Sequence, residues 1–174
     1  MSTLTEKCAA VRLVLTDVDG VLTDGRLILD NQGVESKEFH IRDGQGIRLW
    51  QQSGGRFGIV TGRSSQIVKL RASELGIDLV RQGVEDKWLT VRSICNEIGL
   101  TPAEVCYVGD DLPDLAVVEQ VGLGVAVADA AEEVRQAADY TTSVGGGCGA
   151  LRELVELVLK NANRWETVIR KYRS

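Results

Sequence analysis

Short apolar runs alternate with longer stretches of mixed polarity along most of this chain. The apolar runs are rich in β-branched residues and predict buried strands at residues 11–16, 56–61, 78–82, 105–108, 122–127 and 140–142. The mixed stretches predict helices at residues 44–52, 64–75, 87–98, 112–121, 131–137 and 149–159. Strands that alternate with helices of this length form βαβ units, so we expect an α/β fold built on a parallel sheet.

One segment interrupts this alternation directly after the first strand. Two short alternating runs flank a polar, glycine-containing turn at residues 30–33, which predicts a β-hairpin over about 25–40. A hairpin of this size is too small to be a separate cap domain. The hairpin would overhang the site, and because a lone hairpin is only marginally stable, we expect the uncovered site to take its lid from another subunit.

The end of the chain carries two further signals. Residues 145–149 form a glycine cluster, which predicts a hinge or a loop that another segment approaches closely. Residues 161–174 are basic and contain Trp165 and Tyr172, which predicts a helical tail with aromatic anchors. Two interpretations of this tail stay open, a solvated extension and a docking segment.

Charged and hydroxyl side chains follow the predicted strands. These residues, with one glycine among them, are Asp17 and Asp19 after the first strand, Thr61, Gly62 and Arg63 at the end of the second, Lys87 at a helix start, and Asp110 and Asp111 after the fourth. The carboxyl ends of parallel strands lie at one edge of the sheet, where open α/β folds bind ligands. Four carboxylates crowded there would repel one another strongly. This repulsion predicts a bound cation, and Mg²⁺ prefers such oxygen ligands.

These residue types suit phosphoryl transfer. Asp17 can attack phosphorus, and Asp19 can protonate the leaving alkoxide and later activate water. Thr61 and Gly62 offer a hydroxyl and a backbone N–H at a helix N-terminus, and Lys87 offers a point charge. Each motif alone has a structural explanation, namely a turn, a helix cap or a solvated lysine. Their joint order along the chain favours a magnesium-dependent phosphate site with an aspartate nucleophile.

Composition narrows the class of protein. The chain has 174 residues, of which 44% are hydrophobic and 26% charged, a normal balance for one globular domain over 1–174. The net charge of −5 argues against a nucleic-acid partner, which needs a basic face. It does not exclude an anionic substrate, because a local cluster of cations can outweigh a distant acidic surface.

The cysteines and the apolar runs bear on location. Cys8, Cys95, Cys106 and Cys148 contain no C-x-x-C pair, so neither a zinc site nor a disulfide framework is predicted, and Cys95 and Cys106 are expected to be buried. The apolar runs are too short to span a bilayer, and the first ten residues lack a signal region. We therefore expect a cytoplasmic protein without a membrane partner.

The site residues resemble the four motifs of the haloacid dehalogenase superfamily of phosphohydrolases. The matching stretches are Asp17-Val18-Asp19, Thr61, Lys87 and the segment Gly109-Asp110-Asp111-Leu112-Pro113-Asp114. The resemblance covers nearly the whole chain. It implies a doubly wound, Rossmann-like (HAD-like) parallel sheet without a cap domain and with Mg²⁺ as cofactor.

Further stretches look like one family within this superfamily, the phosphatases of 3-deoxy-D-manno-octulosonate 8-phosphate. They are the segment from Asp17 to Gly25, the hairpin, His40-Ile41-Arg42-Asp43-Gly44, Gly46-Ile47-Arg48, Thr61-Gly62-Arg63, the stretch from Gln82 to Lys87, the segment from Tyr107 to Asp114, and residues 149–153. This resemblance implies a small-molecule sugar phosphate as substrate. It also implies a homotetramer whose hairpins form a barrel and whose neighbouring subunits complete the sites.

The resemblance also implies roles for individual residues. Catalysis would fall to Asp17, Asp19, Thr61 and Lys87, and metal binding to Asp17, Asp19, Asp110 and Asp111. Substrate would contact Asp19, His40, Ile41, Arg42, Asp43, Gly44, Arg48, Gly62, Arg63, Arg71 and Lys87. The chain departs from the family pattern at His40, where asparagine is common, and at Cys148, which replaces an arginine in the glycine-rich loop.

Three hypotheses for the function remain: a phosphatase of an eight-carbon sugar-acid phosphate, a phosphatase of a nine-carbon one, and a phospho-acceptor domain. Arg63 favours an eight-carbon sugar-acid phosphate, whereas relatives that act on a nine-carbon acid 9-phosphate tend to have glutamate at that position. A mutase is disfavoured because no larger cap is present. A receiver-like phospho-acceptor domain, which is not an enzyme, also clusters aspartates with a threonine and a lysine. Asp19, placed to hydrolyse an acyl phosphate, and the hairpin both oppose that reading.

Overall fold

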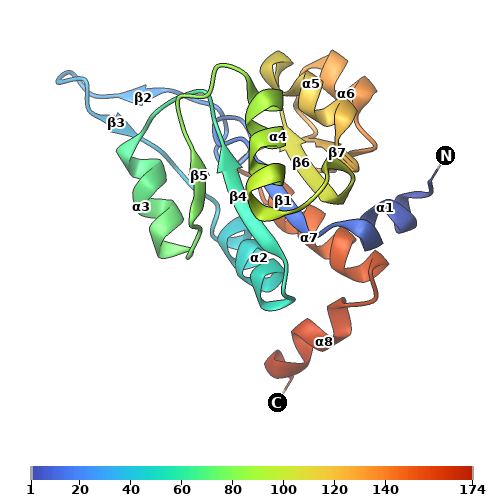
Figure 1. The fold of residues 1–174 in the computed structure, drawn as a ribbon. Coiled ribbons are helices and arrows are strands. Elements are labelled where there is room, and N and C mark those ends of the chain that lie inside the picture. The colour runs from blue at the N-terminus through green and yellow to red at the C-terminus, as the bar shows by residue number, and fades with distance from the viewer. Residues whose placement is uncertain (1, 174) are drawn as a thin grey trace.

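A computed structural model describes residues 2–173. Six strands form one parallel sheet in the order β5-β4-β1-β6-β7-β8 (Figure 1). These strands are β1 (Leu13–Thr16), β4 (Arg56–Val60), β5 (Leu79–Arg81), β6 (Val105–Gly109), β7 (Leu123–Ala126) and β8 (Tyr140–Thr141). The predicted α/β fold with a parallel sheet is confirmed, and each strand lies within or close to its predicted range.

Helices cover both faces of the sheet. On one face α2 (Ile41–Gln52) packs against α7 (Ala150–Asn161), and α1 (Leu4–Ala10) packs against α7. On the other face α4 (Lys87–Ile98), α5 (Leu112–Gln120) and α6 (Glu132–Ala137) pack in succession, and α3 (Gln66–Glu74) lies beside β5 at the sheet edge (Figure 1). Among residues 2–173, no helix combines the length and apolar character that crossing a bilayer requires.

The strand order places a crevice at the centre of the sheet. After β1 the chain builds β4 and β5 on one side, and then returns to build β6, β7 and β8 on the other. The order therefore reverses at β1. In open α/β sheets, ligands bind at this reversal, outside the carboxyl ends of the strands.

The predicted hairpin is confirmed and projects from the body of the molecule (Figure 1). It consists of β2 (Ile28–Leu29) and β3 (Glu35–Ser36), which pair antiparallel. Asp30 holds the turn, because its backbone N–H donates to the Val34 carbonyl at 3.1 Å. The hairpin exposes four apolar side chains, which we call the hairpin patch: Leu27, Ile28, Leu29 and Val34.

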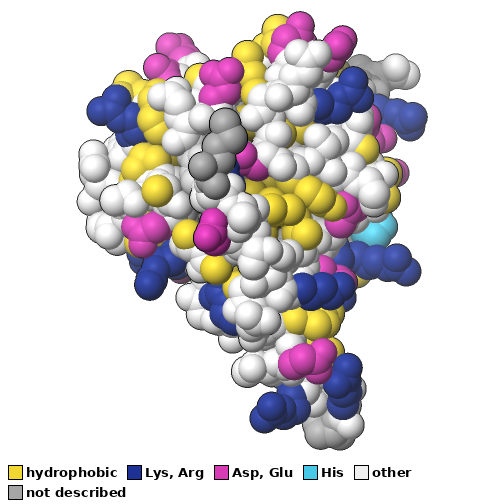
Figure 2. Space-filling view, turned by 90° about the vertical axis from the view of Figure 1, so that its right-hand side faces the viewer, with side chains coloured by type: hydrophobic (Ala, Val, Ile, Leu, Met, Phe, Trp, Pro, Cys, Tyr) yellow, Lys and Arg dark blue, Asp and Glu magenta, His cyan; other side chains and the backbone are white. Residues whose placement is uncertain are grey.

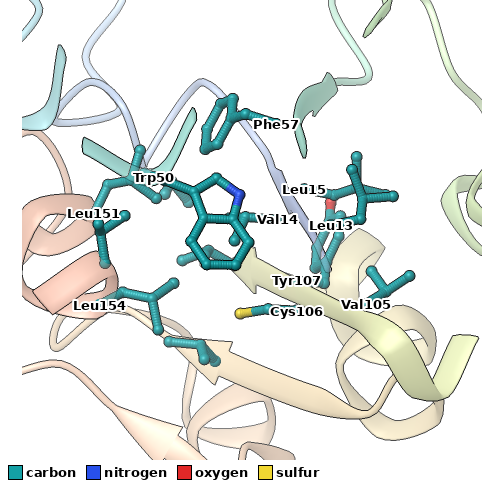
Figure 3. Packing of buried hydrophobic residues seen from close by; sticks show 14 of the residues in the cluster. Leu13, Val14, Leu15, Trp50, Phe57, Val105, Cys106, Tyr107, Leu151 and Leu154 are labelled. Carbon is teal, nitrogen blue, oxygen red and sulfur yellow. The ribbon is translucent and has the colours of Figure 1, made fainter. Parts of the chain in front are cut away.

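The core lies on both faces of the sheet, and its largest buried side chain belongs to the α2–α7 face. Trp50 of α2 is fully buried against Phe57, Leu151 and Leu154 (Figure 3). Its indole N–H donates to the Arg56 carbonyl at 2.6 Å, so this large side chain leaves no unpaired polar group. Cys95 and Cys106 are buried thiols, as predicted.

The two ends of the chain are helical. Helix α1 was not predicted, and a capping box between Thr3 and Glu6 starts it. The tail forms α8 (Trp165–Ile169) and the 3₁₀ helix η2 (Arg170–Tyr172), and the hydroxyl of Tyr172 accepts a hydrogen bond from Gln45 at 2.9 Å. In this structure the tail therefore docks on α2 of its own chain. Figure 2 shows that Lys and Arg side chains gather on this C-terminal end.

The glycine-rich loop before α7 is a close-approach loop. A Cβ at Gly146 would lie 1.8 Å from the carbonyl oxygen of Gly20. The loop therefore packs directly on the turn that follows β1, and only glycine permits this distance.

Candidate active site

Strand β1 delivers Asp17 to the crevice. All four residues of β1 are buried, and Asp17 follows at its carboxyl end with 8% of its surface exposed. Its Oδ1 accepts the Val18 N–H at 2.6 Å, and its Oδ2 accepts from Lys87 Nζ at 2.6 Å. Burial raises the pKa of Asp17, and the Lys87 charge partly opposes that rise.

Lys87 is a fixed cation between two carboxylates. It opens α4, which Asp86 caps by accepting the Leu89 N–H at 2.8 Å. Only 5% of Lys87 is exposed, and its Nζ lies 2.6 Å from both Asp17 and Asp114. Burial alone would lower the pKa of Lys87, but the two carboxylates raise it overall, so the ammonium stays charged.

Asp110 has the features of a metal ligand. It follows β6, and its Oδ2 lies where a Cβ at Gly20 would stand, 1.9 Å from that position. Its Oδ1 is buried and has no hydrogen-bond partner among residues 2–173. Burial, followed by the charges of Asp114 and Asp17, raises the pKa of Asp110 to about 7.

Three carboxylates converge at this point. One oxygen from each of Asp17, Asp110 and Asp114 lies within 4.8 Å of the others. An orphaned buried oxygen, a glycine that makes room for it and an all-oxygen donor set together fit a hard divalent cation such as Mg²⁺.

Asp114 was not among the predicted site residues. Its Oδ1 accepts from Lys87 and from the Tyr107 hydroxyl at 2.5 Å, and its Oδ2 accepts the backbone N–H groups of Asp110 and Asp111 at 3.1 and 3.4 Å. Gly109 makes this possible, because a Cβ there would lie 2.4 Å from Asp114 Cβ. One signal in the sequence could have identified Asp114. It is an acidic residue in the first turn of the predicted helix that follows Asp110 and Asp111.

Asp111 lies differently from its neighbour Asp110. Asp111 is exposed, and its carboxylate is the N-cap of α5, accepting the Leu112 N–H at 2.8 Å. It borders the same cavity as Asp110 but is not part of the three-carboxylate cluster. The predicted metal-binding role of Asp111 therefore has an observed structural alternative, the capping of α5.

The hairpin brings charge to Asp19. The ammonium of Lys37 forms an ion pair with Asp19 Oδ1, and Arg63 Nη1 lies 3.9 Å from Asp19 Oδ2. Glu35, also on the hairpin, accepts from Arg63 Nη2 at 2.7 Å. Neither Glu35 nor Lys37 was predicted to contribute, although Glu35 lies in β3 and Lys37 follows directly after it.

The loop after β4 forms another wall of the site. Thr61 is buried, and its backbone N–H donates to the Arg81 carbonyl at 2.9 Å. Gly62 and Arg63 follow it and are exposed. The helix that follows is α3, whose N-cap is Ser65, although the Ser65 side chain makes no capping hydrogen bond.

All four predicted catalytic residues line one cavity of about 410 Å³. Its lining includes eight predicted residues, Asp17, Asp19, Thr61, Gly62, Arg63, Lys87, Asp110 and Asp111, together with Gly25, Val84, Glu85, Pro113 and Asp114. The structure thus brings together side chains that are up to 97 positions apart, from Asp17 to Asp114.

The other predicted substrate-binding residues do not line this cavity. They are His40, Ile41, Arg42, Asp43, Gly44, Arg48 and Arg71. His40 is the N-cap of α2, since its Nδ1 accepts the Arg42 N–H at 3.2 Å, and Ile41 is 76% exposed. Arg48 donates to the Glu74 carbonyl at 3.4 Å.

Asp43, Gly44 and Arg71 make structural contacts within the chain. Asp43 is buried and accepts the Arg152 N–H at the start of α7 at 2.9 Å. Arg71 pairs with Glu74 at 2.8 Å and stacks over Phe39. Gly44 leaves room for Arg71, whose Nη2 lies 2.5 Å from the position of a Cβ at Gly44.

Comparisons with known proteins agree with this site. Residues 70–145 match the family of haloacid dehalogenase-like hydrolases. The 3-deoxy-D-manno-octulosonate 8-phosphate phosphatase of Salmonella typhi is 44% identical over 153 residues, covering 88% of this chain and 81% of the relative. The enzyme of the same name from Yersinia pestis is 42% identical over 161 residues, covering 92% and 86%.

Solved structures give the same result. The Moraxella catarrhalis phosphatase of that name, crystallised with magnesium, phosphate and the sugar acid, is 40% identical, with a TM-score of 0.95 over 97% of each chain. The cobalt-bound phosphatase of Haemophilus influenzae is 38% identical, with a TM-score of 0.87 over 90% of this chain and 92% of that one. This chain therefore belongs to the haloacid dehalogenase-like hydrolases and, within them, to the 3-deoxy-D-manno-octulosonate 8-phosphate phosphatase family.

Proposed function

We propose that this protein is a phosphoric monoester hydrolase that converts 3-deoxy-D-manno-octulosonate 8-phosphate to the free sugar acid and inorganic phosphate, with Mg²⁺ as cofactor. The observation that carries the proposal is the buried Asp17, which is paired with Lys87 beside carboxylates that fit a divalent cation. Relatives 42–44% identical to this chain carry the name of that activity.

Asp17 is the nucleophile in this mechanism. Its carboxylate oxygen forms a bond to phosphorus while the bond from phosphorus to the sugar oxygen breaks. Asp19 donates its proton to the leaving alkoxide and then takes a proton from the water that attacks the aspartyl phosphate. Phosphate leaves, and both carboxylates return to their starting states.

The fixed cation and the loop after β4 hold the phosphoryl group. Lys87 is buried, charged and already oriented toward Asp17, so it stabilises negative charge without rearranging during the reaction. Thr61 and Gly62 border the same cavity and provide a hydroxyl and a backbone N–H.

The carboxylates of Asp17 and Asp110 would hold the metal ion, with the backbone carbonyl of Asp19 as a further ligand. The ion neutralises charge on the non-bridging oxygens of the phosphoryl group. Asp114 uses both of its oxygens for hydrogen bonds to Lys87, Tyr107 and backbone N–H groups, so its role is to orient Lys87 and the loop of Asp110.

Arg63 provides the group that selects a sugar acid. It borders the cavity, and its side chain is 51% exposed. The planar guanidinium matches a carboxylate with two parallel hydrogen bonds, so it suits the acid end of the substrate. Ile41, Arg42 and Arg48 lie outside the cavity and are exposed, and we propose that they contact substrate in the site of a neighbouring subunit.

The wider setting of this activity is also proposed. The hairpin patch is exposed and apolar, which supports assembly into a homotetramer in which neighbouring subunits complete each site. We assign the protein to the cytoplasm and to lipopolysaccharide biosynthesis, which is where the family's product is used.

Phosphate release across three substrates tests the proposal. The panel consists of the eight-carbon sugar-acid 8-phosphate, the nine-carbon sugar-acid 9-phosphate and an aryl phosphate, each with Mg²⁺. We expect kcat/KM to be at least about a hundredfold higher for the first, about 2.7 kcal/mol in transition-state binding. A preference for the nine-carbon compound would keep the mechanism and change the substrate. Slow turnover of all three with a long-lived phospho-Asp17 would instead favour a phospho-acceptor domain.

A further inference from the structure

The hairpin returns two charged side chains to the active site of its own chain, and the mechanism above uses neither. Lys37 is almost completely buried, with 1% of its side chain exposed, and it pairs with Asp19 and, at 3.4 Å, with Glu35. Glu35 has 18% of its side chain exposed. It does not line the cavity, but it contacts Arg63, which does.

Both carboxylate oxygens of Glu35 are used. Oε1 accepts from Arg63 Nη2 at 2.7 Å, and Oε2 accepts from the Ser65 hydroxyl at 3.1 Å. Arg63 and Ser65 both belong to the loop between β4 and α3. Glu35 therefore joins the hairpin to this loop through two contacts that end on different oxygens.

The charges in this group balance. When Asp19 is ionised, two carboxylates, Asp19 and Glu35, face two cations, Lys37 and Arg63. Because Lys37 offsets the charge of Glu35, that carboxylate can restrain Arg63 without adding a net negative charge where an anionic substrate must enter. One nitrogen of the Arg63 fork is bound to Glu35, and the rest of the guanidinium remains available to the cavity.

We propose that Glu35 is a positioning residue that fixes the guanidinium of Arg63 at the rim of the cavity, so that the hairpin sets the selectivity for phosphate esters that carry a carboxylate. A half-exposed arginine otherwise samples many rotamers. If one rotamer is already fixed before binding, less side-chain entropy is lost when the substrate binds. The inference rests on the proposed function, because it explains how the proposed phosphatase prefers a sugar-acid substrate.

Kinetics of Glu35→Ala on two substrates test this proposal. We expect kcat/KM for the sugar-acid 8-phosphate to fall roughly tenfold, mainly through KM, while kcat/KM for an aryl phosphate stays unchanged. Glu35→Gln preserves side-chain volume and keeps the measurement valid if the alanine variant fails to fold, with a smaller loss in the same direction. Glu38→Gln is the matched control, since Glu38 is exposed on the same segment.

A double-mutant cycle separates positioning from general damage. If Glu35 acts through Arg63, Glu35→Ala has no further effect on selectivity in the Arg63→Ala background. Ser65→Ala, which removes the second anchor of Glu35, lowers selectivity in the wild-type background. Equal losses on both substrates, or additive losses in the cycle, would overturn the inference. If the wild-type protein itself lacks the preference for the sugar acid, the proposed function fails instead.

Discussion

Lys87 lies at the same short distance from two buried carboxylates, and this arrangement keeps charge in an apolar interior. Each partner is 2.6 Å from the ammonium, and Asp114 receives three further donors, from Tyr107 and from two backbone N–H groups. Asp17, in contrast, keeps lone pairs free for chemistry. Asp114 therefore holds the Lys87 ammonium in place, while the Asp17 carboxylate stays free to react.

Replacement of the nucleophile is the first test at this scale. Asp17→Asn preserves size and the N–H contact but removes nucleophilicity, so kcat should fall by several orders of magnitude. Phosphate release with the sugar-acid phosphate measures this effect, and circular dichroism checks the fold. Asp78→Asn, at an exposed position, is the control and should be indistinguishable from wild type. Activity in Asp17→Asn close to wild type would remove Asp17 from the nucleophilic role.

Asp110 predicts a pH dependence of metal binding. Its pKa of about 7 in the metal-free protein means that Mg²⁺ must displace a proton below that pH. The apparent Mg²⁺ affinity should therefore rise roughly tenfold between pH 6 and pH 8 for one titrating carboxylate. Calorimetric titration at the two pH values measures the change, and Asp110→Asn should weaken binding and abolish the pH dependence. Equal affinities in the wild-type protein would contradict this assignment.

The same pKa shift also affects stability, and its effect has the opposite sign to that of a carboxylate whose pKa is lowered by an ion pair. The folded metal-free protein holds the Asp110 proton more tightly than the unfolded chain, whose pKa is near the ordinary 3.8. The unfolded state thus binds fewer protons between these values, and the free energy of unfolding from this group falls as pH rises from about 4 to about 7. Thermal melts in the presence of a chelator should follow this trend, and Asp110→Asn should reduce it.

At the scale of elements, Asp43 connects the two helices that cover one face of the sheet. Its carboxylate lies in α2 and accepts the Arg152 N–H at the N-terminal turn of α7, where unpaired backbone donors need a partner. Burial raises the pKa of Asp43, and the backbone hydrogen bonds at this turn partly offset that rise. A sequence motif that resembles a substrate-binding stretch thus contains a residue that holds two helices together.

Asp43→Ala distinguishes these two roles. Loss of the buried acceptor should lower the free energy of unfolding by about 1–3 kcal/mol and leave KM for the sugar-acid phosphate unchanged. Urea denaturation and steady-state kinetics measure the two effects, with Asp78→Ala as an exposed control. An unchanged denaturation midpoint with a raised KM would show that Asp43 binds substrate instead.

An unbroken apolar run accompanies burial at the centre of the sheet, whereas strand β2 of the predicted hairpin is exposed at both residues. Strands β1 and β6 are buried at every position, and Gly99 ends α4 in the left-handed conformation that suits a C-terminal glycine. Helix α1 was missed because it spans only seven residues, of which Cys8 alone is buried, so it has no apolar period to detect. The capping pattern of Thr3 and Glu6 was the available signal.

Site residues that directly follow a strand could be predicted from the sequence. Residues that reach the site only through tertiary contacts could not. Asp17, Asp110 and Lys87 directly follow strands or begin a helix, so topology brings them together. Asp114 and Glu35 enter through contacts with side chains 27 and 28 positions away, Lys87 and Arg63. No local pattern specifies the Glu35–Arg63 pair, whereas Asp114 lies in the segment from Gly109 to Asp114 that resembles a superfamily motif.

At the scale of the whole molecule, the hairpin carries the exposed apolar surface on which the proposed assembly rests. Two residue pairs hold it, and the apolar side chains of the hairpin patch remain 41–57% exposed. Ile41 and Leu70 add further exposed apolar surface, at 76% and 63%. Because Glu35 and Lys37 connect the same hairpin to the site, assembly through the patch would also order groups next to Asp19.

Leu29→Glu tests that connection in the full-length protein. A charge in the hairpin patch should prevent burial against another subunit, so light scattering should give a smaller mass than for the wild type. Hydrolysis of the sugar-acid phosphate should fall more than hydrolysis of an aryl phosphate, because the neighbour no longer completes the site. Leu89→Glu places the same charge at an exposed leucine of α4 and should leave mass and selectivity unchanged. A wild-type protein that is monomeric at micromolar concentration, or a Leu29→Glu variant that keeps the wild-type mass, would contradict assembly through the hairpin.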